Sequence, residues 1–156
     1  MSMTEKSQHA TIVLERTYQA PLERVFSEFA DPVARARWSA PSNDSLVYDE
    51  ADFQIGGKDV FRCGPKGSPK FRGETRYLDI APNARVISSE TIDVDSQRLA
   101  VALTTLDFEP TDDASNLRVT IQMVSFAGQG IIHGYESGNK SVLKNLSLHL
   151  SNIRST

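Results

Sequence analysis

Hydrophobic and polar residues alternate with a period of two through most of the middle of the chain, a pattern that predicts β-strands. The clearest example is the segment 117–123, in which Leu117, Val119, Ile121 and Met123 alternate with polar residues. Clusters of Gly, Pro, Asn and Asp interrupt the pattern at regular intervals and predict turns. Strands are therefore expected at 11–18, 46–53, 58–63, 71–80, 85–92, 98–108 and 117–123.

Two short helices are predicted between the first and second strands. Residues 22–29 repeat apolar side chains at helical spacing, directly after a proline. Asp31-Pro32 marks a second helix start, because Asp can cap free backbone N–H groups and Pro has no N–H to leave unpaired. This second helix is expected to end near Arg37.

A long helix is predicted at the end of the chain, from about Tyr135 to Ile153. The preceding segment, 126–134, contains glycines and is expected to be a loop, and Gly138 is an unfavourable residue near the helix start. The apolar residues that recur at helical spacing are Val142, Leu143, Leu146, Leu150 and Ile153.

Consecutive strands with helices segregated from them indicate an α+β fold. A sheet of this many strands has to curl, and only the last helix is long enough to cover its apolar face. A curved sheet around one helix leaves a wedge, which becomes a pocket wherever side chains do not fill it. We expect residues 1–9 to form a flexible tail and residues 10–156 to form a single domain.

Composition narrows the class of function without naming a substrate. Of the 156 residues, 39% are hydrophobic and 24% charged, as in an ordinary globular domain. The net charge of -3 argues against a nucleic-acid partner. The polar first residues do not resemble a secretory signal, and no apolar run is long enough to span a membrane. A cytoplasmic protein without membrane insertion is therefore expected.

Established catalytic and cofactor motifs are absent from the sequence. Gly128-Gln129-Gly130 lacks the spacing of a nucleotide-binding loop. The chain has one cysteine, Cys63, and three scattered histidines, so neither a cofactor nor a metal is predicted. Cys63 itself is expected to be a small buried hydrophobic residue.

Charged residues on the predicted strands are interpreted as facing solvent. Asp49, Glu50 and Asp52 could form an acid/base pair, but a solvated strand face is favoured because nothing nearby would raise a pKa. Residues Arg72, Glu74 and Arg76 share the polar side of one strand and are expected to make cross-strand charge pairs.

Two residues allow both a structural and a functional interpretation. Trp38 either anchors the short helices over the sheet, which is favoured, or forms part of a pocket wall. His133 is expected at the pocket mouth, in the loop that leads into the last helix. There it would either orient a ligand or be an ordinary loop histidine.

Five short motifs follow one another between Ile12 and Val86. They are Arg16-x-Tyr18-x-Ala20-Pro21-x-x-x-Val25-Phe26, Asp31-Pro32 with Trp38, Asp52-x-x-Ile55-Gly56-Gly57, Phe71-x-Gly73, and Pro82-x-x-Arg85-Val86. In this order they resemble the SRPBCC (START/Bet v 1-like) superfamily and, within it, domains related to the C-terminal domain of the activator of the heat-shock protein 90 ATPase. Two positions depart from that pattern: Gln54 stands where arginine is common, and Gly138 is followed by Asn139 rather than tryptophan.

The resemblance implies a helix-grip fold, in which a curved antiparallel sheet wraps around a long C-terminal helix and encloses a cavity. It implies a binding protein for a small hydrophobic or amphipathic molecule, such as a lipid. The expected lining residues are Phe26, Phe29, Trp38, Phe61, Phe71, Tyr77, His133, Tyr135, Leu143 and Leu146.

Two other functions stay open at this stage. The chain could be an enzyme, a cyclase or hydrolase, with His133, Tyr77, Tyr135 and Glu136 converging in the cavity. It could instead be a protein-interaction module related to chaperone activation. A homodimer through exposed strand edges, or through the loop around Phe126, is a further expectation.

Overall fold

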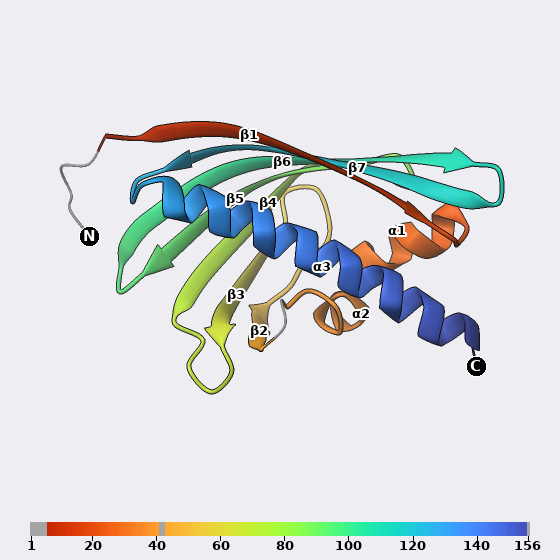
Figure 1. The fold of residues 1–156 in the computed structure, drawn as a ribbon, viewed down its shortest axis with the longest axis horizontal. Coiled ribbons are helices and arrows are strands. Elements are labelled where there is room, and N and C mark those ends of the chain that lie inside the picture. Colours follow the sequence, from red (N-terminus) through yellow and green to blue (C-terminus); the bar gives the residue numbers. More distant parts are fainter. Residues whose placement is uncertain (1–5, 41–42, 156) are drawn as a thin grey trace.

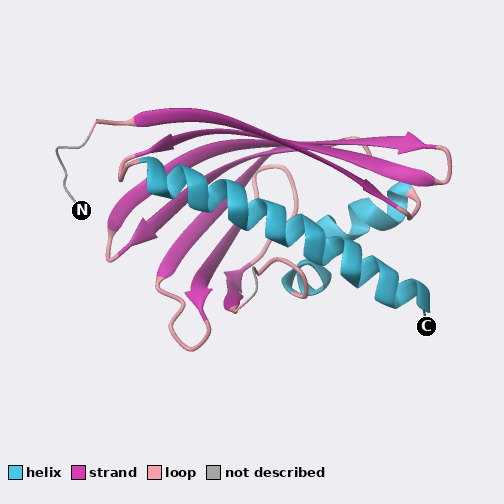
Figure 2. Cartoon of the chain, in the orientation of Figure 1, coloured by secondary structure: helices cyan, strands magenta, loops and turns pink. Residues whose placement is uncertain are grey.

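The computed structural model describes residues 6–40 and 43–155, and it consists of one antiparallel sheet with a long helix across its concave face (Figures 1 and 2). This is the expected α+β helix-grip fold, with two short helices after the first strand. The elements are β1 (Gln8–Tyr18), α1 (Leu22–Ala30), α2 (Pro32–Ala36), β2 (Asp44–Glu50), β3 (Lys58–Pro65), β4 (Phe71–Ala81), β5 (Arg85–Val94), β6 (Gln97–Thr111), β7 (Ala114–Ser125) and α3 (Gln129–Ser155).

The sheet has the strand order β1-β7-β6-β5-β4-β3-β2, so each strand from β2 to β7 pairs with its neighbour in sequence. β1 lies at the other edge of the sheet and pairs antiparallel with β7 over its whole length. The edges of the sheet are therefore β1 and β2. In the predicted strand 117–123 the apolar residues are buried, because they face the concave side where α3 packs.

α3 begins at Gln129, six residues earlier than predicted, so the expected loop over 126–134 is mostly helix. Gly130 and Gly134 lower helix propensity, which is why the sequence pattern suggested a loop. Burial of Ile132 against the core offsets that cost. None of the described helices is both long and apolar enough to cross a membrane.

The two halves of α3 meet the sheet differently. In the second half, Leu143, Leu146 and Leu150 are buried in the main core, and the Tyr18 hydroxyl donates a hydrogen bond to the Leu143 carbonyl (3.1 Å). The first half carries Gly134 and Gly138, which place little side-chain volume over the sheet. The wedge between sheet and helix is therefore filled at one end and hollow at the other.

Other predicted boundaries shift by a few residues. β1 begins at Gln8 and so takes His9 from the expected tail, whose residues 1–5 lie outside the described part of the chain. β2 ends at Glu50, and residues 51–57 form a loop.

The charge pairs expected across strands lie along β4 instead. Glu74 accepts from Arg76 at 2.7 Å and lies 4.0 Å from Arg72. Glu74 lies opposite Val60 and Thr91, neither of which is charged. Arg72 lies opposite Arg62, a like charge, and opposite Asp93, which pairs with Arg98 instead. Arg62 instead makes a two-pronged contact with Asp49 on β2.

Gly73 is the position in the sheet where a side chain is excluded. It lies opposite Phe61 in the β3–β4 register, and a Cβ at this position would overlap the Phe61 ring. We predict that Gly73→Ala lowers the free energy of unfolding by about 1–3 kcal/mol, because the ring must leave its packed position.

Urea unfolding of both forms measures this difference, and Gly130→Ala provides the control. Gly130 lies in α3, and a Cβ at this position would meet no atom within 4 Å, so alanine there should be neutral or stabilising by up to about 1 kcal/mol. Equal stabilities for Gly73→Ala and the unsubstituted protein would contradict the close packing of Phe61.

Candidate functional site

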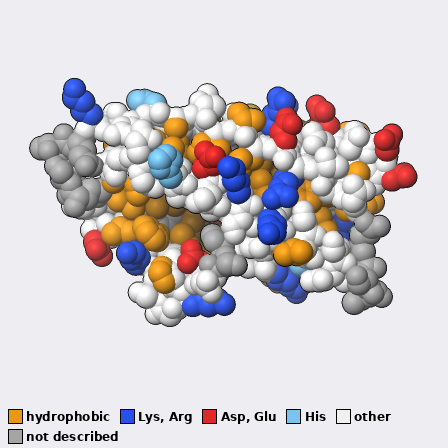
Figure 3. Space-filling model, in the orientation of Figure 1, with side chains coloured by type: hydrophobic (Ala, Val, Ile, Leu, Met, Phe, Trp, Pro, Cys, Tyr) orange, Lys and Arg blue, Asp and Glu red, His pale blue; other side chains and the backbone are white. Residues whose placement is uncertain are grey.

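A cavity of about 320 Å³ lies between the first half of α3 and the concave face of the sheet. Figure 3 shows hydrophobic side chains gathered in a hollowed area beside this part of the helix, so the cavity opens to solvent. The lining residues are Phe29, Arg35, Trp38, Ser39, Leu46, Tyr48, Phe53, Asp59, Phe61, Cys63, Thr75, Tyr77, Val86, Ser88, Glu90, Ile92, Thr104, Leu106, Gly134, Tyr135, Gly138, Asn139 and Val142.

The floor of the cavity is built by alternate residues of neighbouring strands. Because side chains on a strand alternate between faces, every second residue of β5 from Val86 to Ile92 faces inward. The register places Thr75 of β4 beside Glu90 of β5, and Thr104 of β6 beside Ser88. These four polar residues form a continuous band across three strands.

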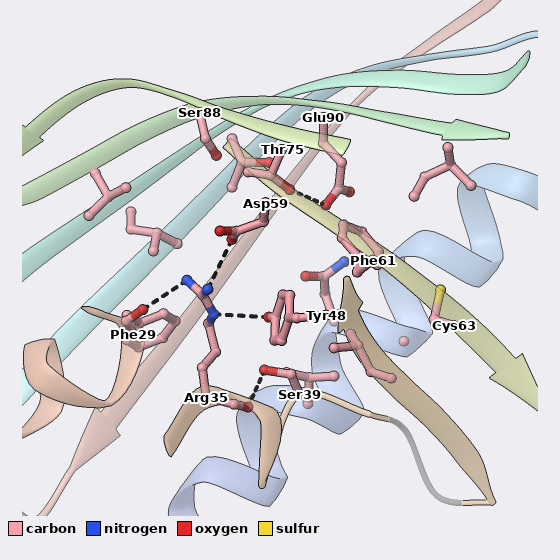
Figure 4. A pocket seen from close by; sticks show the side chains of 18 of the residues that line it. Phe29, Arg35, Ser39, Tyr48, Asp59, Phe61, Cys63, Thr75, Ser88 and Glu90 are labelled. Atoms are coloured by element: carbon pink, nitrogen blue, oxygen red, sulfur yellow. Dashed lines mark hydrogen bonds and ion pairs between the residues drawn. The ribbon is translucent and has the colours of Figure 1, made fainter. Parts of the chain in front are cut away.

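A buried guanidinium group occupies one end of this cavity (Figure 4). Arg35 is only 8% exposed and donates from Nε to the Tyr48 hydroxyl (2.9 Å) and from Nη2 to Asp59 (2.9 Å). Its Nη1 donates both to the Phe29 carbonyl (2.9 Å) and to the Tyr77 hydroxyl (2.7 Å). Tyr77 in turn donates to the same Asp59 carboxylate. The network joins α1, α2, β2, β3 and β4.

The loop between β2 and β3 fixes the acceptors of this network. The Asp52 amide donates to Asp59 Oδ1 (3.2 Å), and the backbone of Tyr77 pairs with Gly56 and Gly57 at 2.8 and 3.0 Å. A Cβ at Gly57 would overlap the Asp52 carbonyl, so this turn requires glycine there. The Asp-x-x-Ile-Gly-Gly motif therefore serves to position Asp59 and Tyr77.

Local chemistry keeps Arg35 charged and its tyrosine partners protonated. Burial alone would lower the pKa of Arg35, but the neighbouring Tyr48, Tyr77 and Asp59 together raise it above its ordinary value. Burial raises the pKa of Tyr48 and of Tyr77, and it does so against the lowering effect of the Arg35 charge. The network therefore holds one cation and one carboxylate, and it carries no net charge.

Glu90 is the second carboxyl group in the cavity, and no cation pairs with it among the described lining residues. Its Oε1 accepts a hydrogen bond from the Thr75 hydroxyl (3.2 Å). Burial raises its pKa from 4.5 to about 7, with a smaller contribution from the Asp59 charge and an opposing one from Thr75. Glu90 can therefore change protonation state near neutral pH.

Two buried polar atoms in the described part of the chain lack a hydrogen-bond partner, the Trp38 indole N–H and the Tyr135 hydroxyl. Both residues line the cavity. Burying a polar group without a partner costs free energy. These two atoms are therefore hydrogen-bonding groups in the cavity that the protein itself leaves unpaired.

The cavity also contains the thiol of Cys63, and burial raises its pKa to about 11, with smaller contributions from Glu90 and Asp44. The thiol is therefore neutral at physiological pH, a state that does not favour nucleophilic chemistry. Within the described residues, His, Cys, Asp and Glu form no cluster of three or more that could hold a metal ion.

A protein-family model matches most of the chain. The family model described as Activator of Hsp90 ATPase homolog 1-like protein matches residues 19–151, well over half of the chain. The chain belongs to this family. Among curated proteins, none matches it.

Solved structures with a similar fold also match this chain. A Rhizobium loti protein is 31% identical, with a TM-score of 0.82, over 92% of this chain and 98% of that chain. A Rhizobium leguminosarum protein is 28% identical, with a TM-score of 0.81, over 95% and 98%. A Chromobacterium violaceum protein is 26% identical, with a TM-score of 0.78, over 88% and 94%.

The structure brings half of the predicted site residues to the cavity of this family member. Trp38 combines both interpretations, since it lines the cavity and also packs edge-on against Phe29 with ring centroids 4.8 Å apart. Whether these residues contact a ligand stays a prediction. The five that line the cavity are Phe29, Trp38, Phe61, Tyr77 and Tyr135.

The other five predicted residues lie elsewhere. Phe26, Leu143 and Leu146 are buried in the core, because α1 and the second half of α3 close the wedge there. Phe71 lies half-buried at the start of β4, beneath the Lys70 amino group. His133 is exposed, because the helix begins before it and turns it away from the cavity.

The sequence did not predict which polar residues, apart from the tyrosines, line the cavity. Arg35 is followed closely by another arginine on a short helix and gave no sign that it would be buried. Glu90 lies in the predicted strand 85–92, whose pattern indicates a strand and no site. A weak signal was available, since Ser88 and Glu90 lie between Val86 and Ile92 at a spacing of two residues, which places two polar residues on a face expected to be apolar.

The Arg35–Asp59 pair yields a testable prediction. We expect Arg35→Met to lower the free energy of unfolding by about 3–5 kcal/mol, because Asp59 would be left buried without its ionic partner. The double variant Arg35→Met/Asp59→Asn should lose less than the sum of the single variants. Urea unfolding measures all three. The exposed pair Arg62–Asp49 is the control, and Arg62→Met should change stability little.

Glu90 yields a second prediction, on pH. A carboxyl group whose pKa is raised on folding favours the folded state at low pH, and that contribution is lost as pH rises from 4.5 to about 7. Glu90→Gln removes this loss. The stability of the variant relative to the unsubstituted protein should therefore rise by about 1–3 kcal/mol between pH 4.5 and pH 8.

Unfolding curves across that pH range test the prediction, with Glu109→Gln on the exposed end of β6 as the matched control. The control should show a flat difference. A flat difference for Glu90→Gln as well would show that the cavity does not perturb this carboxyl group.

Proposed function

We propose that this protein binds a small amphipathic molecule in the cavity between α3 and the sheet. The observation that carries the proposal is a cavity of about 320 Å³ with aromatic and aliphatic walls and a polar floor. Ligand sites of proteins typically measure about 300–1,000 Å³ and combine apolar walls with a few placed polar groups. The family fold supports a ligand-binding role of this general kind.

Two features indicate that the cavity is a built feature of the fold. Gly134 and Gly138 occupy the side of α3 that faces it, and no atom lies within 4 Å of the Cβ position at Gly134. Glycine is costly inside a helix, by roughly 1 kcal/mol relative to alanine. At the other end, the ion pair of Arg35 and Asp59 keeps the cavity wall from collapsing, because moving one partner would leave the other as an unpaired buried charge.

The polar groups do not converge as the enzyme hypothesis expected. Tyr77 and Tyr135 line the cavity, but His133 is exposed and Glu136 forms an ion pair with Lys140 (2.9 Å) on the helix surface. Binding is therefore the function that the arrangement favours. The chaperone-related role and the homodimer stay predictions.

Blocking the cavity tests the proposal. The fluorescent, uncharged aromatic 1-aminoanthracene serves as the probe, and binding is followed by its own emission and by quenching of Trp38, the single tryptophan. We expect Gly134→Leu to weaken probe binding by about tenfold or more, because its side chain would occupy the open space at the mouth.

Gly130→Leu is the matched control, since Gly130 is exposed on the same helix, has equally open surroundings and does not line the cavity. It should bind the probe as the unsubstituted protein does. The proposal fails if the unsubstituted protein binds neither this probe nor any molecule of a lipid and aromatic-metabolite panel. It also fails if Gly134→Leu binds the probe as tightly as Gly130→Leu does.

A further inference from the structure

The charges in the cavity are unequally matched. Arg35 is the only cation among the described lining residues, and its guanidinium donates to four acceptors of the protein: Phe29, Tyr48, Asp59 and Tyr77. The Asp59 carboxylate accepts hydrogen bonds from Arg35, Tyr77 and the Asp52 amide. The Arg35–Asp59 pair is therefore electrically complete and leaves no free cation for a ligand to meet.

Glu90 lies outside that pair. Its one hydrogen bond shown by the structure comes from the neutral Thr75 hydroxyl, on one of its two carboxylate oxygens. Figure 4 shows Glu90, Thr75 and Ser88 projecting from neighbouring strands toward the same space. This end of the floor offers hydrogen-bond acceptors and negative charge, and the described lining residues place no positive charge against it.

The arrangement matches the donors of one chemical group. Ser88 lies two residues from Glu90 on the same face of β5, about 7 Å away, and Thr104 lies directly opposite Ser88 on β6. A primary ammonium group has three N–H donors and a positive charge, and it can meet a carboxylate and flanking hydroxyl oxygens together. An alcohol lacks the charge, and a carboxylate would be repelled.

We propose that Glu90, with Thr75, Ser88 and Thr104, binds the protonated amine of an amphipathic ligand whose apolar part lies against the aromatic wall of the cavity. This inference rests on the proposed binding function and names the ligand class for it. The aromatic wall includes Phe61 and Tyr135. When Glu90 is ionised it repels a carboxylate, so fatty acids and other amphipathic anions should bind more weakly than amines at pH 8.

Protonation gives the proposal a second readout. The titratable and charged groups that share the cavity with Glu90 are Arg35, Tyr48, Asp59, Cys63, Tyr77 and Tyr135. The tyrosines Tyr48 and Tyr77 and the thiol of Cys63 have raised pKa values and stay neutral through neutral pH. Arg35 stays charged. Burial raises the pKa of Glu90 to about 7, so amine binding should strengthen as the pH rises through neutrality.

Three ligands with one eight-carbon chain isolate the contribution of the head group. Octylamine, 1-octanol and octanoate compete against 1-aminoanthracene at pH 8 with the unsubstituted protein, Glu90→Gln and the control Glu109→Gln. We expect octylamine to bind at least about tenfold more tightly than the other two. Glu90→Gln should remove that preference and leave octanol binding within about twofold, whereas Glu109→Gln should behave as the unsubstituted protein.

The same competition at pH 5.5 completes the test. Octylamine should bind about tenfold more weakly than at pH 8 to the unsubstituted protein, and with no such change to Glu90→Gln. If octanol or octanoate binds as well as octylamine, or if octylamine does not displace the bound probe, the inference is overturned while the binding function stands. If neither the probe, nor any octyl compound, nor any molecule of the lipid and aromatic-metabolite panel binds, both are overturned.

Discussion

The buried ion pair between Arg35 and Asp59 is the interaction on which the cavity depends. It connects a five-residue helix to β3, the second strand from the β2 edge of the sheet, and a helix this short cannot hold its position through its own backbone hydrogen bonds. Through the Phe29 carbonyl the same guanidinium also reaches the end of α1. One side chain thereby connects two helices and three strands at the end of the cavity that holds the guanidinium group.

A charged group at this place has a consequence that an apolar one would not have. An apolar cluster can shrink around a void by moving side chains, which lowers the cost of a cavity. Arg35 and Asp59 cannot move apart without leaving a buried charge unpaired, and each is further held by Tyr77. The pair adds little to net stability by this reasoning, but it restricts the wall to one geometry beside an open space.

The sequence predicted those features that repeat along the chain. The alternation in 117–123 and the apolar spacing of Leu143, Leu146 and Leu150 follow from which face meets the core, so the strands, the last helix and the α+β class could be inferred. The start of α3 could not, because burial of Ile132 overrides the low helix propensity of two nearby glycines. Local preference and tertiary packing disagree there, and packing prevails.

The site was predictable only in its apolar part, for a related reason. Periodicity reports which residues face inward, but it does not tell a filled interior from a hollow one. Leu146 and Val142 lie one turn apart on the same helix, yet Leu146 is in the core and Val142 faces the cavity. What separates them is their tertiary surroundings, which are built by segments distant in the sequence. One such contact lies between these two residues, where the Asn145 side-chain amide donates to the Ala40 carbonyl (2.8 Å).

The polar floor follows from the same geometry. A carboxyl group on the inward face of β5 would be expelled from a filled core, since burying a charge without a partner is costly. Beside an open cavity Glu90 retains access to water or to a ligand, so its burial raises the pKa without forcing the group out. The presence of Glu90 on this face is therefore itself an argument that the space above it is occupied by something other than protein. The family fold supplies the space, and in our proposal these few inward polar residues set which ligand it accepts.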